Sequence, residues 1–238
     1  MKTAVKEPEK VRIWDVFDRI APRYDLLNRL LSGGIDQIWR SKAARYLPEE
    51  SPFVLLDMAT GTADLLITFL KKSPFITHAI GMDMSRKLLE IGQKKIDQSG
   101  FSKKTSLVHG DALKMPFPDA HVDVISISFG IRNFSDLDTA FREIKRVLKS
   151  KGRLIILEFS IPQNRWIKPI YLFYFRVILP VIGSLISGDK SAYKYLNQSV
   201  ETFPFGDAFC EICRAHGFTV KAIPLTFGIA TIYSAQKC

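Results

Sequence analysis

Residues 53–64 of the chain read FVLLDMATGTAD, an apolar run that ends in an acidic residue and continues through small residues. This pattern predicts a buried strand, a tight turn and the start of a helix. A second apolar run ends at Asp83, at about the spacing at which nucleotide-binding folds place a carboxylate on the ribose hydroxyls. The two runs together predict an adenosine site. The alternative for the first run is an ordinary strand-to-helix connection.

The residues around the turn indicate which adenosine ligand it takes. The sequence contains neither GxGxxG nor GxxxxGK[ST], the loops that bind pyrophosphate or triphosphate through backbone N–H groups. Asp57 and Asp64 flank the turn, where they would repel a pyrophosphate but suit a ligand with an amino group and a sulfonium. Residues 60–63 are small enough to let the amino-acid end of such a ligand approach the backbone. The predicted cofactor is therefore S-adenosylmethionine, in a site formed by Asp57, Thr60, Gly61, Thr62, Asp83 and Met84.

Length and composition limit the architecture and the compartment. With 238 residues, 47% of them hydrophobic, the chain is long enough for one full core and is predicted to be a single domain, with a helical cap at 1–50 and a lid insertion at 161–205. The N-terminus has no apolar signal-peptide core and cysteines are sparse, so a cytoplasmic location is expected. Cys210 and Cys213 have the spacing of a redox pair or half a zinc site. Because no second ligand pair exists, they are predicted to be inert buried thiols, and no metal is expected.

Most of the net charge of +10 lies in residues 141–200, which carry eleven Lys and Arg but three Asp and Glu. The segment 166–186 within them is nearly as apolar as a membrane span. Arg176 and Pro180 interrupt it, so it is expected to form one or two broken helices. Two interpretations stay open. The segment is a buried core helix, or it is an apolar lid that also touches a membrane, with basic residues toward anionic headgroups.

Apolar runs alternate with helical patterns along the chain. This order predicts an α/β fold with a mostly parallel sheet, helices on both faces and the ligand at the carboxyl ends of the strands. The expected strands are 53–57, 79–83, 106–109, 122–128 and 154–158, followed by an antiparallel edge hairpin from 219–224 and 229–235. The expected helices are 11–20, 36–46, 65–71, 85–98 and 137–149, with a break at 32–34.

Two further motifs fall at the same edge of the predicted sheet. Asp111 follows the third strand, where its carboxylate can accept a hydrogen bond from the adenine amino group. Residues 126–133, which read SISFGIRN, follow the fourth strand, where the methyl acceptor is expected. This segment has neither the [DN]PP[YF] tetrad of base N-methyltransferases nor a nucleophilic cysteine. It has Arg132 beside Asn133, a cation and an amide that suit an acceptor passing through an oxyanion.

Four ordered motifs, at residues 24–39, 126–133, 146–160 and 193–204, are spread along nearly the full length of the chain. In them the chain resembles the demethylmenaquinone methyltransferase family of menaquinone and ubiquinone biosynthesis, which implies the Rossmann-like fold of class I methyltransferases. Three departures stand out. Asp36 stands where the first motif usually has His, Ser150-Lys151 replaces a usual Pro-Gly, and Ala63 replaces a glycine common in the cofactor turn.

The resemblance implies methyl transfer from S-adenosylmethionine to a ring carbon of a polyprenylated quinol, giving menaquinol from demethylmenaquinol. The alternative substrate is a polyprenyl methoxybenzoquinol of ubiquinone biosynthesis. By position, the family's cofactor contacts fall on Thr62, Asp83, Asp111, Ala112 and Ser128. Because a polyprenyl tail is insoluble in water, we expect peripheral contact with the inner face of the membrane. A homodimer or a complex of quinone-biosynthesis enzymes is the expected assembly.

The chemistry assigns roles to the acceptor side. A phenol with a pKa near ~10 costs about 4 kcal/mol to deprotonate at neutral pH, and a ring carbon is a poor nucleophile until that happens. We expect Arg132 to stabilise the phenolate, Asn133 or Tyr195 to orient it, and a water or a carboxylate to take the proton. The alternative for Arg132 is a salt bridge to Asp136 or Asp138. The expected walls of the quinol site are Tyr24, Phe129, Tyr193 and Tyr195.

Two rival functions stay open. The basic segment is compatible with an RNA methyltransferase, although the base-binding tetrad is missing and the segment is largely aliphatic, so no nucleic-acid partner is expected. A cofactor-binding scaffold without catalysis is the other rival, and the intact cofactor residues argue against it.

Overall fold

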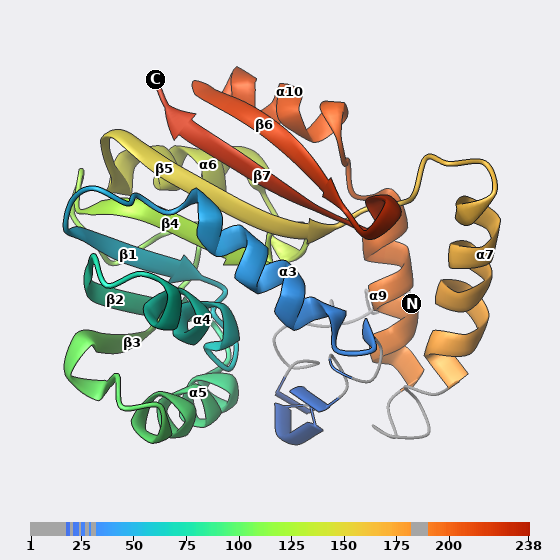
Figure 1. Cartoon of the computed structure of the whole chain (residues 1–238), viewed down its shortest axis with the longest axis horizontal. Helices are drawn as coiled ribbons and strands as arrows, with labels where there is room; N and C mark the ends of the chain where they lie inside the picture. Colours follow the sequence, from blue (N-terminus) through green and yellow to red (C-terminus); the bar gives the residue numbers. More distant parts are fainter. Residues whose placement is uncertain (1–17, 20, 24, 27–28, 30–31, 182–189) are drawn as a thin grey trace, which may run out of the picture.

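The computed structural model describes residues 18–19, 21–23, 25–26, 29, 32–181 and 190–238, without the side chains of Arg23 and of residues 190–194. The described chain forms a seven-stranded sheet in the order β3-β2-β1-β4-β5-β7-β6 (Figure 1). Strands β1 to β5 pair in parallel, whereas β7 runs antiparallel to both β5 and β6. The predicted α/β fold and its antiparallel edge hairpin are confirmed. The strands are β1 (Phe53–Met58), β2 (Ile76–Asp83), β3 (Thr105–His109), β4 (Val122–Ser128), β5 (Leu148–Phe159), β6 (Phe218–Leu225) and β7 (Ala230–Lys237).

Helices cover both faces of this sheet. On one face Trp39, Leu66 and Ile96 enter a core with the sheet, and on the other face Phe141 and Phe209 do so. The helices are α3 (Ile35–Ala43), α4 (Asp64–Lys72), α5 (Arg86–Gln98), α6 (Leu137–Val147), α7 (Ile167–Phe173), the π-helical η5 (Tyr174–Ile178), α9 (Lys190–Thr202) and α10 (Asp207–Ala215). Because both faces are covered, the central strands β1 and β4 are apolar along most of their length, which is why they are visible in the sequence.

Local signals place the ends of two of these helices. Ser85 precedes α5, and its side chain accepts a hydrogen bond from the Leu88 N–H. Asp136 precedes α6 and accepts from the Thr139 N–H at 3.1 Å. Both are side-chain caps of the type that helix N-termini favour. Asp136 is therefore not the partner of Arg132 that the sequence left open.

Strand β5 begins at Leu148, six residues before the predicted start at Leu154, and α6 ends at Val147, two residues before the predicted end of the helix. The pairing of β5 with β4 is interrupted between the pairs Val122–Leu148 and Val124–Arg153. Lys151 lies in this irregular stretch with φ 59°, a left-handed conformation that favours glycine. The residue that replaces a usual glycine of the family thus adopts the geometry that a glycine would adopt there.

The apolar segment after β5 forms α7 and η5 and stands at one end of the sheet beside α9 (Figure 1). One side of it is buried, through Tyr171, Phe175 and Leu179, and packs with Val200 of α9. The opposite side is exposed, with five large apolar side chains that recur at helical spacing: Trp166, Ile170, Phe173, Val177 and Val181. The predicted break at Arg176 and Pro180 is wrong for the described part of the segment, because the helix runs on through both residues to Val181 with a π-helical stretch at 174–178. The segment is only half buried. No helix in the described ranges is long and apolar enough to cross a membrane.

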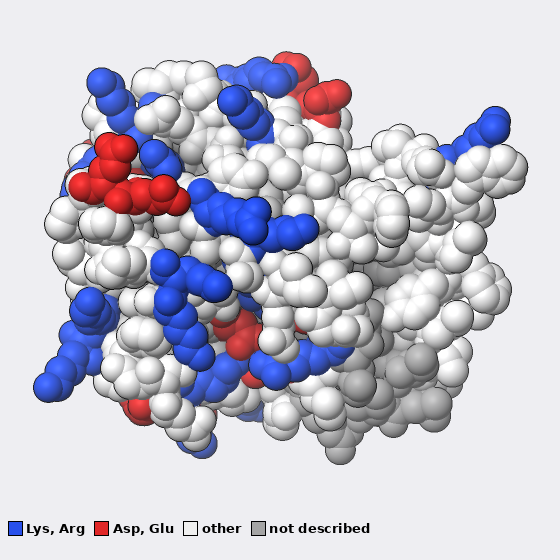
Figure 2. All heavy atoms as spheres, viewed as in Figure 1, with Lys and Arg blue, Asp and Glu red and all other residues white. Residues whose placement is uncertain are grey.

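The basic residues of 141–200 do not gather on this apolar helix. Arg146 and Lys149 pair with acidic residues near the start of β5, at the end of the sheet opposite the strands' carboxyl ends. Arg165, Lys168 and Arg176 accompany α7 and η5. Figure 2 shows blue atoms mainly over the sheet and its helices, whereas the surface around α7 is almost entirely white. The charge is therefore divided between two ends of the molecule.

Cys210 and Cys213 lie on α10 and are both buried in the core with Phe209. Burial raises the pKa of both thiols, which disfavours the thiolate that redox chemistry and metal binding need. No group of three or more His, Cys, Asp or Glu side chains suited to a metal occurs among the described residues.

Candidate cofactor and acceptor site

The register of the sheet brings the predicted site residues to one edge. Met58 at the end of β1 pairs with Met82 of β2 and with Ile127 of β4. Asp83 and Ser128 each follow one residue later, so they end their strands at the same level. Asp83 in turn pairs with His109, the residue before the Gly110-Asp111 turn. Parallel strands thus deliver side chains from four separate parts of the sequence to a single rim.

The turn after β1 has an unusual backbone. Ala59, Gly61 and Ala63 all take positive φ, at 51°, 56° and 64°. The turn is held to β2 by the Thr60 N–H, which donates to the Met82 carbonyl at 3.0 Å. Ala63 replaces a usual glycine and nevertheless adopts left-handed geometry, a conformation that is strained for a residue with a Cβ.

Asp57 lies beneath this turn and is 1% exposed. Its carboxylate accepts hydrogen bonds from the Thr60 hydroxyl at 2.6 Å and from the Ser126 hydroxyl at 2.5 Å. Burial raises the pKa of Asp57 to about 6, against the lowering effect of these two hydroxyls. The sequence prediction treated Asp57 as a cofactor ligand. In the structure it joins the turn to β4.

Asp83 organises the rim from β2. Its two oxygens accept from the Gly61 N–H and the Ser85 N–H, each at 2.8 Å. Burial raises the pKa of Asp83. The Gly110 N–H donates to the Asp83 carbonyl at 3.1 Å, which places the Asp111 turn directly beside it. Asp83 is thus held between the turn after β1 and the turn after β3, at the strand end where nucleotide-binding folds place the ribose carboxylate, and its contact with a ribose stays a prediction.

The remaining predicted cofactor residues lie on the same rim. Asp111 accepts from the Leu113 N–H at 2.9 Å, and Ala112 is buried in the core beneath it. The Met84 carbonyl lies 3.0 Å from the His109 imidazole. The buried hydroxyl oxygen of Ser128 has no hydrogen-bond partner in the described part of the chain. Because buried polar groups are nearly always paired, this oxygen indicates a place for a ligand.

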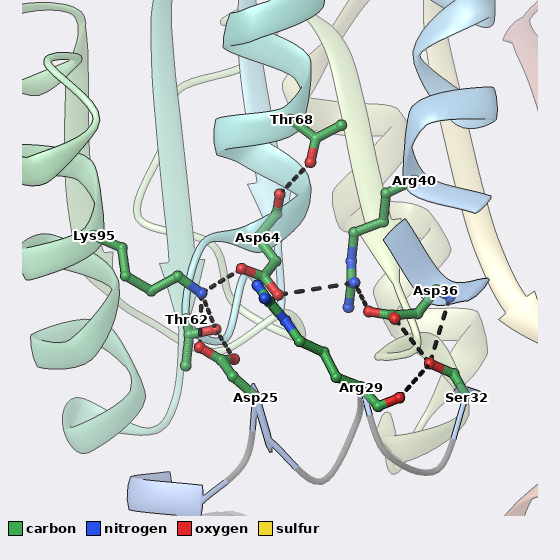
Figure 3. Close-up of polar contacts among 9 residues, drawn as sticks. All are labelled: Asp25, Arg29, Ser32, Asp36, Arg40, Thr62, Asp64, Thr68 and Lys95. Atoms are coloured by element: carbon green, nitrogen blue, oxygen red, sulfur yellow. Dashed lines mark hydrogen bonds and ion pairs between the residues drawn. The ribbon is translucent and has the colours of Figure 1, made fainter. Parts of the chain in front are cut away.

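The hydroxyl of Thr62 belongs to a polar network that the sequence did not predict (Figure 3). It donates to Asp25 at 2.6 Å and accepts from Lys95 of α5 at 3.1 Å. Lys95 also pairs with Asp25 and with Asp64 of α4. The network therefore ties a residue near the N-terminus to the cofactor turn.

Asp36 continues this network on α3. It pairs with Arg40, whose guanidinium lies 3.8 Å from Asp64, and it accepts from the Ser32 hydroxyl at 2.8 Å (Figure 3). Asp36 is 3% exposed. The carboxylate that replaces a usual histidine of the family is thus a buried ion-pair partner at this position.

On the acceptor side, the segment after β4 forms the short helix η4 (Ile131–Asn133). Arg132 of η4 donates to the Phe129 carbonyl and pairs with Glu158 of β5, each contact at 2.6 Å. Both charged side chains are almost fully buried. The salt bridge left open for Arg132 therefore exists, but its partner is Glu158, and Asp138 instead lies 3.1 Å from His216.

Asn133 and Tyr195, two polar residues predicted for the acceptor site, are hydrogen-bonded to each other near the Arg132–Glu158 pair. Tyr195 of α9 donates to the side-chain carbonyl of Asn133 at 3.0 Å, and burial raises the pKa of the tyrosine. Phe129 is 8% exposed and stacks on Phe159, with ring centroids 4.4 Å apart, so it lies largely within the core. Tyr24 lies outside the described residues. The side chain of Tyr193 does as well, although its backbone is part of α9.

Glu158 is the functional candidate that the sequence reasoning missed. Its signal was the same as that of Asp57 and Asp83, a carboxylate at the end of an apolar strand. The spacing between the first strand and Asp83 made Asp83 a predicted ribose ligand. No comparable spacing in the sequence predicted that Glu158 would pair with Arg132.

Three features fit S-adenosylmethionine. They are the rim carboxylates of Asp83 and Asp111, the turn after β1 with its small residues, and the Ser128 hydroxyl, which has no partner among the described residues. The seven-stranded sheet with its site at this rim is that of a class I methyltransferase that depends on S-adenosylmethionine. The model of the ubiE/COQ5 methyltransferase family matches residues 2–237, and the chain belongs to this family.

Similar proteins agree with this assignment. The chain is 43% identical over 222 residues to the demethylmenaquinone methyltransferase of Thermus thermophilus, covering 93% of this chain and 100% of that protein. It is 42% identical over 227 residues to the ubiquinone/menaquinone biosynthesis C-methyltransferase UbiE of Geotalea uraniireducens, covering 95% and 96%. A crystal structure of an S-adenosylmethionine-dependent methyltransferase from Aquifex aeolicus matches with a TM-score of 0.62 at 14% identity, covering 90% and 98%. The predicted family, fold and cofactor are confirmed.

The raised pKa of Asp57 predicts a pH-dependent affinity for the cofactor. A cationic ligand favours the ionised carboxylate, so affinity should rise as the pH passes upward through about 6, where Asp57 ionises. We expect binding to be about tenfold weaker at pH 5 than at pH 7.5 if this one group governs it. Calorimetric titration across this range measures the effect, with Asp57→Asn as the variant that should lose the dependence. An affinity that stays constant from pH 5 to 7.5 would contradict the prediction.

Proposed function

We propose that this methyltransferase transfers a methyl group from S-adenosylmethionine to a ring carbon of a polyprenylated quinol, converting demethylmenaquinol to menaquinol. The observation that carries the proposal is the buried guanidinium of Arg132, next to the hydrogen-bonded side chains of Asn133 and Tyr195. The similar proteins named above support the substrate class. Methylation of a polyprenyl methoxybenzoquinol remains the alternative within the same chemistry.

The cofactor supplies an electrophilic methyl group, and the residues of the rim hold it. We assign this binding to Asp57, Thr60, Gly61, Thr62, Asp83, Met84, Asp111, Ala112 and Ser128. Among them, Asp83 is placed to accept from ribose hydroxyls, and Ser128 has a hydroxyl with no partner in the described ranges. Asp57 and Thr62 act through the turn that they hold in place.

The acceptor side must lower the cost of ionising a quinol hydroxyl. Arg132 uses one terminal nitrogen for both of its contacts, so its other N–H groups are available to a phenolate. Asn133 and Tyr195 present an amide and a hydroxyl that orient the ring, with Tyr24, Phe129 and Tyr193 as proposed walls. Holding the ring carbon in line with the methyl group contributes a further ~7–11 kcal/mol through proximity.

The exposed side of α7 and η5 gives the insoluble tail a route to the protein. Its five apolar side chains face solvent, and Arg165 and Lys168 lie at the start of the same segment. We assign to it a peripheral contact with the inner face of the cytoplasmic membrane, as part of a lid at 161–205 on a single domain that also includes a cap at 1–50. A homodimer or a complex of quinone-biosynthesis enzymes is the proposed assembly.

Transfer of labelled methyl from S-adenosylmethionine tests the function. The acceptors are a short-tailed demethylmenaquinone with and without a reductant, a benzoquinol analogue, and bulk RNA. We expect product from the naphthoquinone only under reduction, because the quinone has no hydroxyl to ionise. Preference for the benzoquinol would assign the ubiquinone pathway instead. Product from RNA alone, or cofactor binding without any product, would refute the proposal.

Tyr195→Phe tests the orienting role. Loss of the hydroxyl leaves the Asn133 amide free to rotate. We expect the KM for the quinol to rise and kcat to fall, so that kcat/KM falls about tenfold, which corresponds to about 1.4 kcal/mol. Tyr46→Phe, at a tyrosine outside the site, is the matched control. Quinol kinetics equal to those of the unchanged protein would remove Tyr195 from the site.

A further inference from the structure

The Arg132–Glu158 ion pair has two buried polar atoms left over. Oε1 of Glu158 accepts from Arg132 and from the Phe159 N–H at 2.8 Å. Oε2 of Glu158 and Nε of Arg132 have no hydrogen-bond partner among the residues that the structure describes. The two side chains are only 2% and 6% exposed. Such buried orphans are rare in folded proteins and call for a partner.

These two atoms lie at the acceptor end of the proposed site. Glu158 follows Leu157, the residue of β5 that pairs with Ser128. Arg132 belongs to η4, next to Asn133 with its bound Tyr195. One atom is an acceptor and the other a donor. A phenolic hydroxyl has the complementary pair of properties, since it can donate to a carboxylate oxygen and accept from a guanidinium.

Building on the proposed function, we infer that Oε2 of Glu158 accepts the hydroxyl proton of the quinol during methyl transfer. The O–H bond of the substrate breaks, its proton binds to Oε2, and the electron pair stays on the ring oxygen, facing Arg132. The ring carbon then bonds to the methyl group as the methyl–sulfur bond breaks and the sulfur keeps that pair. Water takes the proton from the same carbon, the C–H electron pair restores the aromatic ring, and the ring oxygen takes its proton back from Glu158. One proton leaves overall, which balances the lost sulfonium charge.

The surroundings of Glu158 suit a base. Burial raises its pKa above that of an ordinary glutamate, and Arg132 opposes this effect without cancelling it. Among the described residues, Tyr195 from α9, Tyr233 from β7 and Tyr171 from α7 interact with the pair, and burial raises the pKa of all three. A tyrosine with a raised pKa stays protonated at neutral pH, so none of these three can accept the quinol proton in place of Glu158. A base must be ionised to act, so activity should fall as the pH drops through the pKa of Glu158.

Glu158→Gln keeps the volume and the contact with Arg132 but removes the base. At neutral pH we expect kcat to fall at least about 100-fold, the lower end of what a general base contributes. The acid limb of the pH–rate profile should disappear, and the remaining activity should rise with pH as the quinol itself ionises. Glu143→Gln removes a carboxylate from another Glu–Arg pair, with Arg146, and should leave both kcat and profile unchanged. An unchanged acid limb in Glu158→Gln would overturn the inference.

A second measurement needs no turnover and no cofactor. An acidic nitronaphthol, already ionised at pH 8, stands in for the phenolate. We expect the unchanged protein to take up close to one proton when it binds this anion, because Glu158 becomes protonated beside it. Calorimetry in two buffers of different ionisation enthalpy counts that proton. Glu158→Gln should bind the anion without proton uptake and at least tenfold more tightly, whereas Glu143→Gln should behave as the unchanged protein.

The outcomes separate the two proposals. Binding of the naphtholate by the unchanged protein without proton uptake would overturn the role of Glu158, even if Glu158→Gln failed to fold. Absence of methyl transfer to any quinol, with proton uptake intact, would refute the proposed function and leave the acid–base site standing. Normal methylation by Glu158→Gln would refute only the role of Glu158.

Discussion

We expect Arg132→Met to lower the free energy of unfolding by about 3–5 kcal/mol, because it leaves the buried carboxylate of Glu158 without its partner. The loss should depend on pH. An unpaired buried carboxyl has a folded-state pKa above its unfolded value, so the penalty is full at high pH and shrinks as the pH falls and the group protonates. Chemical denaturation from pH 5 to 8 measures both effects.

The same variant should lose turnover for a separate reason. Removing one preorganised donor from a developing oxyanion lowers kcat by about 100- to 1,000-fold in well-studied enzymes. We therefore expect a fall of that size in methyl transfer to a quinol, with the affinity for S-adenosylmethionine unchanged, since the hydrogen bonds of Arg132 go to Phe129 and Glu158 and not to the turn after β1.

A double variant separates folding from catalysis. Arg132→Met with Glu158→Leu removes both charges, and replacing a whole buried pair by apolar residues is often neutral or stabilising. Stability should return toward that of the unchanged protein while turnover stays lost. If turnover returned with stability, Arg132 would have only a structural role. If Arg132→Met were as stable as the unchanged protein at pH 8, the pair would not be a buried ion pair.

The sequence was sufficient to predict the centre of the sheet because the central strands β1 and β4 are buried on both faces. Strand β4 was predicted with its observed ends, and β1 differs by one residue. Helix ends marked by capping residues, such as Ser85, were also close. The start of β5 was not, because the irregular stretch around Lys151 depends on pairing with β4, a contact between distant parts of the chain.

The candidate site divides in the same way. Residues at strand ends, such as Asp83 and Ser128, could be placed from the sequence because parallel strands share one carboxyl edge. The partners of side chains could not. Thr62 was predicted as a cofactor contact, yet its hydroxyl binds Asp25 and Lys95, which are distant in sequence. Arg132 was given Asp136 or Asp138 as an alternative partner because they are near in sequence, and a strand 26 residues away supplied Glu158 instead.

The second large effect is expected from Gly130→Ala, at the closest approach of the acceptor segment to the cofactor turn. A Cβ on Gly130 would lie 2.6 Å from the Cβ of Ala59, a rigid atom of the turn after β1. Either the turn or η4 must move, and overpacking of this kind usually lowers stability by about 1–3 kcal/mol. Because the turn belongs to the proposed cofactor site and η4 carries Arg132, we expect both the affinity for S-adenosylmethionine and kcat to fall at least about tenfold, or about 1.4 kcal/mol each.

Ala59→Gly provides the matched rescue. Ala59 has φ 51°, a left-handed conformation in which glycine is unstrained, so this change alone should alter stability by no more than about 1 kcal/mol. In the double variant the clashing Cβ is absent, and stability, cofactor affinity and kcat should all return toward those of the unchanged protein. Thermal unfolding, calorimetry and the methyl-transfer assay follow the three quantities. If Ala59→Gly failed to restore Gly130→Ala, the damage would come from a contact other than that between the two turns, and the coupling of cofactor and acceptor sites through Gly130 would be wrong.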